Sequence, residues 1–299
     1  MKIRNYKLDA LKMCLIISVI FGHIPLLAGF IDLHLPSNYD LLTMHAMKGI
    51  YAFHMPLFVL ISGYFTRRQP LRAQFKKSLR LLRLFIVFQV IDILIRHVFM
   101  GGGTFSLGRW LYPCFALWYL LCLFYWRILL SVIPQKWNPK WIVVISIFIS
   151  ISVGFTNISG ILGLHRFFSF MPYFMIGHYY GVNILQYADY KQFTPTHRKI
   201  LVVSSFFVLM GLASLNPHWL DCIIQPYGSL KVFVIRIAYL CYSLLLCYLL
   251  VCIFNFKHDW NENAVSRWPR HSVLLSFASL YPLPNDNTYW RGRKNNKHI

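Results

Sequence analysis

The chain has 299 residues, of which 57% are hydrophobic, 17% are aromatic and only 13% are charged. A typical soluble domain is about 45–50% apolar and about 25% charged, so the composition excludes an ordinary soluble enzyme and a disordered chain. Lysine and arginine number 30 against 9 acidic residues, for a net charge of +21. These basic residues fall between apolar runs, which indicates loops on the cytoplasmic side of a membrane rather than a nucleic-acid partner.

Eight apolar stretches are long enough to cross the hydrocarbon core of a bilayer as helices. They predict an all-α fold, a polytopic integral membrane bundle of eight transmembrane helices that forms one domain over residues 1–257. Residues 258–299 form an atypical basic C-terminal tail, whose 12-residue apolar run SVLLSFASLYPL is too short to cross. The eight stretches lie near 11–29, 48–66, 79–99, 111–133, 141–157, 165–182, 200–216 and 232–254.

The distribution of basic residues predicts how the bundle is oriented. With the N-terminus in the cytoplasm, 24 of the 30 lysines and arginines fall on the inside. A single missed or added helix would scramble this alternation. The charge pattern therefore favours eight spans with both chain ends in the cytoplasm.

Two ionisable residues share one face of the first predicted helix. Lys12 and His23 are 11 residues apart, which is close to three turns and separates them by roughly 16 Å along the axis. His54 lies at a similar distance from the outer end of the second stretch, so neighbouring antiparallel helices would place both imidazoles at one depth. Imidazole exchanges a proton near neutral pH, which makes the pair a candidate general base. The alternative is a lysine that reaches the lipid surface and histidines that only bond to neighbouring helices.

A basic segment, RRQPLRAQFKKSLRLLR, follows the second stretch. Arg80 and Arg83 lie one turn apart within it, and arginine forks suit the recognition of phosphate groups. They are candidate contacts for a phosphorylated cofactor on the cytoplasmic side. The alternative is a positive-inside loop that touches anionic lipid.

An aromatic pair, Trp118–Tyr119, lies in the fourth stretch near the depth of the two histidines. Such rings can stack on a sugar, which makes the pair a candidate substrate-binding site. A packed position in the core is the more frequent arrangement for residues of this kind.

Motifs of nucleotide, metal or serine-hydrolase chemistry are not found in the sequence, which contains no P-loop, HExxH, GxSxG or dinucleotide fingerprint. The seven cysteines mostly lie in apolar stretches, without a CxxC or His/Cys spacing. We therefore expect no bound metal and interpret the cysteines as small buried hydrophobic residues.

Five segments, in this order, resemble the acyltransferase 3 family, and more narrowly its fucose 4-O-acetylase-like membrane sugar acetyltransferases. They are NYKLDALKMCLIISVIFGH, FHMPLFVLISGYFTRR, SLRLLRLFIVFQV, ALWYLLCLFYWRILL and FFSFMPYFMIGHYYG. The first helix ending in GH and followed by FHMPLF…SGY is the most specific part of the resemblance.

The resemblance implies an O-acetyltransferase of the bacterial inner membrane that moves an acetyl group from acetyl-CoA to a hydroxyl of a sugar or polysaccharide. The family motif of an arginine and a histidine separated by ten residues falls on Lys12 and His23, which keeps the cation but loses the bidentate fork. The family's RxxR motif matches Arg80 and Arg83. The resemblance thus implies that His23 takes the proton of the acceptor hydroxyl and that the three cations contact the phosphates of coenzyme A. Asp9 matches the acidic residue of the family's LDALR opening and is expected to orient the basic cluster.

Two features depart from the family pattern. Its members usually have ten spans, whereas this sequence shows eight, and RHSVLL resembles the start of a later family segment without the helix that would follow. We therefore expect a C-terminally truncated or frame-shifted member. The alternatives are a membrane transporter or exporter of a glycan or small molecule, and an inactive truncated homologue. The distinctive residues concentrate in the first three helices without a symmetric counterpart later, which favours an enzyme over a transporter.

Overall fold

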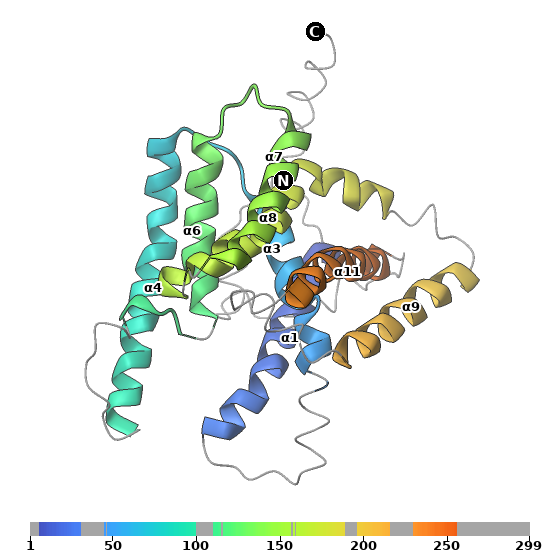
Figure 1. The fold of residues 1–299 in the computed structure, drawn as a ribbon, viewed down its shortest axis with the longest axis horizontal. Helices are drawn as coiled ribbons and strands as arrows, with labels where there is room; N and C mark the ends of the chain where they lie inside the picture. Colours follow the sequence, from blue (N-terminus) through green and yellow to red (C-terminus); the bar gives the residue numbers. More distant parts are fainter. Residues whose placement is uncertain are drawn as a thin grey trace.

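A computed structural model describes residues 6–30, 45, 47–99, 110–114, 116–156, 158, 160–188, 196–215 and 230–255. These residues form α-helices and short 3₁₀ turns, with no strand among them, which confirms the predicted all-α class. The predicted tail, residues 258–299, lies outside the described residues. The α-helices, labelled in Figure 1, are α1 (Tyr6–Phe30), α3 (His54–Phe65), α4 (Leu71–Phe99), α6 (Leu117–Val132), α7 (Pro139–Ser152), α8 (Leu164–Tyr187), α9 (Thr196–Ser214) and α11 (Leu230–Asn255).

Each predicted stretch corresponds to one of these helices, but their bounds differ in a way that places a candidate residue. The second stretch was predicted from residue 48, whereas α3 begins at His54. Pro56 explains the difference, because a proline ring clashes with the carbonyl four residues earlier and is tolerated best in the first turn of a helix. The chain therefore breaks at Ala52 and Phe53 and restarts, with His54 at the first position of α3.

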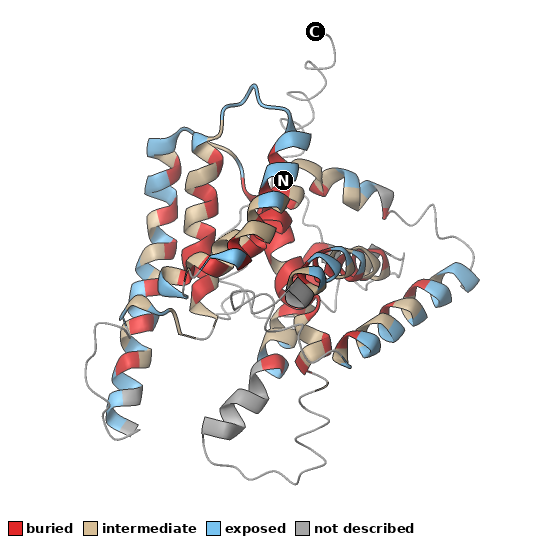
Figure 2. Ribbon diagram, viewed as in Figure 1, coloured by how far each residue is buried: buried red, intermediate tan, exposed pale blue. Residues whose placement is uncertain are grey.

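Length and hydropathy alone identify two membrane-crossing candidates in the described part of the chain, His197–Ser214 and Phe233–Phe254. Leu117–Val132 and Pro139–Phe155 are shorter apolar helices. Large apolar side chains are exposed along α4, α7 and α9, and Figure 2 shows exposed residues along the outer sides of these helices. Such surfaces suit contact with lipid, while the number of spans and their orientation stay predictions.

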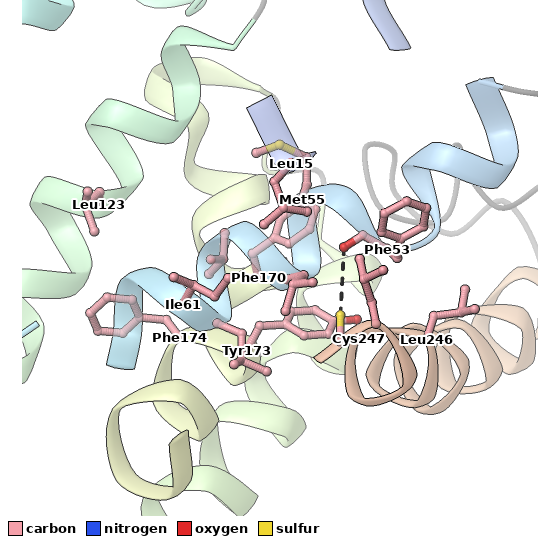
Figure 3. Close-up of a cluster of buried hydrophobic side chains, with 14 of the residues drawn as sticks. Leu15, Phe53, Met55, Ile61, Leu123, Phe170, Tyr173, Phe174, Leu246 and Cys247 are labelled. Carbon is pink, nitrogen blue, oxygen red and sulfur yellow. Dashed lines mark hydrogen bonds between the residues drawn. The ribbon is translucent and has the colours of Figure 1, made fainter. Parts of the chain in front are cut away.

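The helices assemble around the pair α3 and α8, which make the most extensive contact in the bundle. α7 also packs on α8, α9 packs on α11, and α1 contacts both α3 and α11. α4 and α6 stand side by side at one edge of the bundle, as Figure 1 shows. The buried faces converge on α3, where side chains from four other helices meet (Figure 3). The labelled members of that cluster are Leu15, Phe53, Met55, Ile61, Leu123, Phe170, Tyr173, Phe174, Leu246 and Cys247.

Glycines bring α3 and α8 into direct backbone contact. A Cβ atom added at Gly177 of α8 would lie 2.7 Å from the carbonyl carbon of Leu60, and one added at Gly63 of α3 would lie 3.0 Å from the backbone nitrogen of His178. Neither position has room for a side chain. Small residues at a helix interface permit this close approach, which strengthens packing where lipid surrounds the bundle.

Candidate functional site

The predicted cytoplasmic half of α1 carries an ion pair that packs on the end of α3. Lys12 Nζ lies 3.7 Å from Asp9 Oδ1, and the two residues are one turn apart on α1. The same ammonium group lies 3.9 Å from the centroid of the Phe65 ring, which adds a cation–π contact. Lys12 is only 9% exposed. The structure thus joins Asp9 to Lys12, as the predicted orienting role of Asp9 requires.

The predicted arginine pair lies on a different part of the bundle. Arg80 and Arg83 are exposed on α4, whereas the adjacent Leu81 is buried against the bundle. α4 packs mainly on α6, and α1 packs on α3 and α11. The main helix pairings therefore do not join the arginine pair to Lys12. Both arginines are accessible to a large anionic ligand or to lipid phosphates.

An apolar pocket opens beside the Asp9–Lys12 pair. It has a volume of about 280 Å³, including its open mouth, and α1, α3, α8 and α11 line it. Leu8 and Leu11, which flank Asp9 on α1, contribute to its wall together with Tyr64 and Gly181. Its enclosed volume is only about 10 Å³, about the space of one water molecule, and its lining is apolar.

His54 occupies the predicted outer end of α3 and is fully buried. Its Nδ1 lies 2.8 Å from the backbone oxygen of Ile50. A carbonyl oxygen only accepts hydrogen bonds, so Nδ1 carries a proton, and in the neutral form of the ring the lone pair is on Nε2. The ring of Tyr51 packs edge-on against the imidazole, with the centroids 4.7 Å apart. The local fold therefore sets the tautomer that a general base requires at Nε2.

Helix α1 contacts the Tyr51 ring, which packs on His54, at Gly22. A Cβ atom added at Gly22 would lie 3.2 Å from Tyr51 Cε2, so the backbone of α1 lies directly against the tyrosine ring. His23 is the next residue of α1, and its side chain lies outside the described residues. The structure thus brings the backbone of His23 next to the Tyr51–His54 contact.

The predicted substrate-binding pair is packed between three helices. Trp118 is 6% exposed, and its indole stacks on Phe170 with a centroid distance of 5.1 Å. The Tyr119 hydroxyl and Ser62 Oγ form a hydrogen bond of 2.5 Å, and Phe58 meets the Tyr119 ring edge-on. Both rings therefore hold α6 against α3 and α8, and a role in sugar binding stays a prediction.

Tyr51 and Arg166 are site residues that the sequence did not single out. The guanidinium carbon of Arg166 lies 5.2 Å from the centroid of the Trp118 ring, and its charge acts on Tyr51. Tyr51 in turn contacts His54, and its backbone oxygen accepts a 3.0 Å hydrogen bond from the Tyr239 hydroxyl. Tyr51 therefore connects α1, α3 and α11. In the sequence, Arg166 is one of the basic residues assigned to the outer side, and Tyr51 is one of 18 tyrosines. Neither position belongs to a motif that would indicate its contacts.

A second buried cation lies on α11. Arg236 is 3% exposed and donates from its guanidinium to Ser169 Oγ of α8. The Ser169 hydroxyl donates to the backbone oxygen of His165 at 2.8 Å, and His165 is itself 1% exposed. One turn along α11, Tyr239 bonds to Tyr51, so this network adjoins the residues around His54. The predicted outer end of the bundle thus holds several buried cationic or ionisable groups.

Comparisons with known proteins give one result. Residues 5–281 match a family model described as "Acyltransferase domain", a match that runs from the start of α1 past the end of α11. Comparisons with curated proteins and with solved structures give no match. Among the described residues, no group of three histidine, cysteine or acidic side chains is placed to hold a metal ion.

Proposed function

Because the chain belongs to the acyltransferase 3 family of membrane acyltransferases, we propose that it transfers an acetyl group from acetyl-CoA to a hydroxyl of a sugar. The sugar belongs to a surface or exported glycan, and the enzyme lies in the bacterial inner membrane. The observation that carries the proposal is the division of polar groups between the two ends of α1 and α3. The Asp9–Lys12 pair lies at one end, and His54 lies at the other beside the backbone of His23.

The donor site in this proposal is at the predicted cytoplasmic end. Coenzyme A carries phosphates and a thin aliphatic arm, and each has a counterpart here. Arg80 and Arg83 are exposed cations suited to phosphates, and Lys12 adds a third positive charge partly balanced by Asp9. The apolar surface beside Lys12, formed by α1, α3, α8 and α11, is the proposed path of the arm.

The transfer step in this proposal takes place beside the two histidines. The sugar hydroxyl oxygen attacks the thioester carbonyl carbon, so that a C–O bond forms and the C–S bond breaks. A histidine nitrogen takes the hydroxyl proton, and the coenzyme A thiolate leaves and is then protonated. His23 is the proposed base, and His54, whose neutral ring has its lone pair on Nε2, lies one tyrosine ring away from the α1 backbone at Gly22. A base at this position contributes because the hydroxyl is a weak nucleophile until its proton departs.

Purified protein in lipid vesicles tests the proposal against its alternatives. Acetyl-labelled acetyl-CoA is supplied on the predicted cytoplasmic side of the vesicle membrane and the glycan on the opposite side. We expect the label to become covalently bound to the glycan. A transporter would move labelled glycan across the membrane without acetyl-CoA, and that result would contradict the proposal. Binding of coenzyme A without transfer to any glycan would identify an inactive homologue.

The arginine pair gives a prediction specific to the donor. Changing Arg80 and Arg83 together to glutamine is expected to raise the KM for acetyl-CoA about tenfold or more, because each lost charged hydrogen bond is worth about 1.5–3 kcal/mol. The KM for the sugar is expected to stay within about twofold, since the pair lies on α4 at the opposite end of the bundle from His54. Steady-state kinetics in vesicles measure both constants. An unchanged donor KM with altered membrane insertion would assign the arginines to lipid contact instead.

A further inference from the structure

Arg166 connects the residues predicted to bind the sugar with those predicted to act on it. Its guanidinium carbon lies 5.2 Å from the centroid of the Trp118 ring, and its charge acts on Tyr51. The Tyr51 ring contacts the imidazole of His54 on one side and the backbone of Gly22 on another. A ligand group held by Arg166 would therefore place neighbouring atoms of the same ligand towards Tyr51, next to His54 and the backbone of α1 at Gly22.

The contacts of Trp118 define what this indole does for the site. Phe170 stacks on the ring at 5.1 Å, and the guanidinium of Arg166 lies over it. Phe170 is four residues after Arg166 on α8, so both approach Trp118 from one helix face. Cation–π attraction is strongest for tryptophan and fixes the plane of the guanidinium. Trp118 thereby contacts one face of the guanidinium, whose N–H donors lie along the edges of its plane.

The described residues around Arg166 carry further positive or ionisable groups. Arg236 is buried nearby and His165 is 1% exposed, and both lie at the same predicted outer end as Arg166. The described residues contain only two carboxylates, Asp9 and Asp92. Asp9 pairs with Lys12 at the predicted cytoplasmic end, and Asp92 lies on α4, whose main partner is α6 rather than α8. Within the described part of the bundle, the positive charge around Arg166 therefore exceeds the negative charge that balances it.

We propose that Arg166 binds an oxyanion on the acceptor, so that the enzyme acts on an acidic sugar or on a sugar linked to phosphate. This inference rests on the proposed acetyl transfer. A guanidinium presents parallel N–H donors that match the two oxygens of a carboxylate or phosphate, and burial strengthens the attraction. A neutral sugar offers only hydroxyl groups, which meet a partly desolvated cation less well than an anion does. The anion thus orients the acceptor, and the histidines act on a hydroxyl held at a fixed distance from it.

The test compares three acceptors that share one sugar ring: a neutral glycoside, the matching uronic acid glycoside, and the same sugar linked to a lipid diphosphate. Reconstituted wild-type protein is expected to show a KM about tenfold to a hundredfold lower for an acidic acceptor than for the neutral one, the range that a charged hydrogen bond supplies. The acidic acceptor with the lower KM identifies the anion as carboxylate or phosphate.

Variants at position 166 separate recognition from folding. Arg166→Gln is expected to remove the preference by raising KM for the acidic acceptor alone. Arg166→Lys keeps the charge but loses the bidentate fork, so it is expected to retain part of the preference for the acidic acceptor. Arg198→Gln removes an exposed arginine on α9 and serves as the matched control with an unchanged preference. Equal loss for acidic and neutral acceptors in both Arg166 variants would overturn the inference, as would a wild-type protein without preference.

A direct binding measurement keeps this inference distinct from the proposed function. Titration calorimetry of the unreacted glycosides, without acetyl-CoA, reports the preference even if no acetyl group is transferred. Tighter binding of the acidic glycoside that disappears in Arg166→Gln supports the anion site. Equal binding of both glycosides contradicts it, whereas failure of the proposed function shows only as absent transfer to all three acceptors.

Discussion

Alanine at His23 or at His54 is expected to lower acetyl transfer by about a hundredfold to ten-thousandfold, the range typical of removing a general base. His54 has its Nδ1 proton engaged by Ile50, which leaves Nε2 as the basic nitrogen, and the backbone of His23 lies against the neighbouring Tyr51 ring. Single-turnover rates with acetyl-CoA and a sugar acceptor measure the effect. Coenzyme A binding measured on the same variants shows that the donor site is intact.

A double variant and a control sharpen this histidine prediction. If the two imidazoles act as one unit, alanine at both positions is expected to be about as slow as the slower single variant, because such effects are strongly non-additive. His178→Ala is the control. His178 lies on α8 and makes the same kind of bond as His54, from Nδ1 to the backbone oxygen of Thr66 at 2.9 Å. A loss in His178→Ala equal to that in His54→Ala would attribute both to damaged packing.

Alanine at Gly177 is expected to be the most destabilising small substitution in the bundle. The added methyl group would meet Leu60 at 2.7 Å from its carbonyl carbon and 3.0 Å from its Cα, both backbone atoms that cannot rotate away. Overpacking of this kind typically costs about 1–3 kcal/mol, and here it also forces α3 and α8 apart. We expect a clearly lowered melting temperature in lipid vesicles. Activity is expected to fall too, because α3 carries His54 and α8 carries Arg166.

Gly211 provides the matched control for that substitution. It lies in α9, and a Cβ atom added there would meet nothing within 4 Å. Gly211→Ala is expected to leave the melting temperature unchanged or to raise it, because alanine favours a helix by about 1 kcal/mol relative to glycine. Equal destabilisation by the two substitutions would show that the backbone contact between α3 and α8 does not limit stability.

The helices could be predicted from sequence because each is an apolar run of a length that suits a bilayer. Their bounds were less predictable where hydropathy is not what sets them. α4 begins at Leu71, well before the predicted residue 79, because its first turns are basic and polar and so do not form an apolar run. The buried residues of α4 recur every three or four positions, as expected for a helix that packs on one side, and they are Gln74, Ser78, Leu81, Phe85, Gln89 and Ile93.

The residues of the candidate site could also be predicted from the sequence only in part. The Asp9–Lys12 contact follows from spacing on one helix, so that sequence alone could predict it. The function of Tyr51 could not be predicted, because it depends on contacts with Gly22 and Tyr239, which belong to helices far apart in the chain. Arg166 presented the same difficulty. Its charge fitted the count of outside residues, and only the packing of α6 on α8 places it over Trp118.

The glycine contacts between α3 and α8 also have a mechanical consequence. Helices that touch through their backbones have no layer of side chains between them that could change rotamer, so they cannot roll or slide past each other without collision. We therefore expect α3 and α8 to move together as one rigid unit. α4 and α6 meet through flexible side chains such as Phe75 and Phe124, whose ring centroids are 5.9 Å apart, and α4 has its main contact with α6 alone. Because Trp118 and Tyr119 tie α6 to the α3–α8 pair, we expect a motion that opens the bundle to involve α4, while α3 and α8 keep His54 and Arg166 in register.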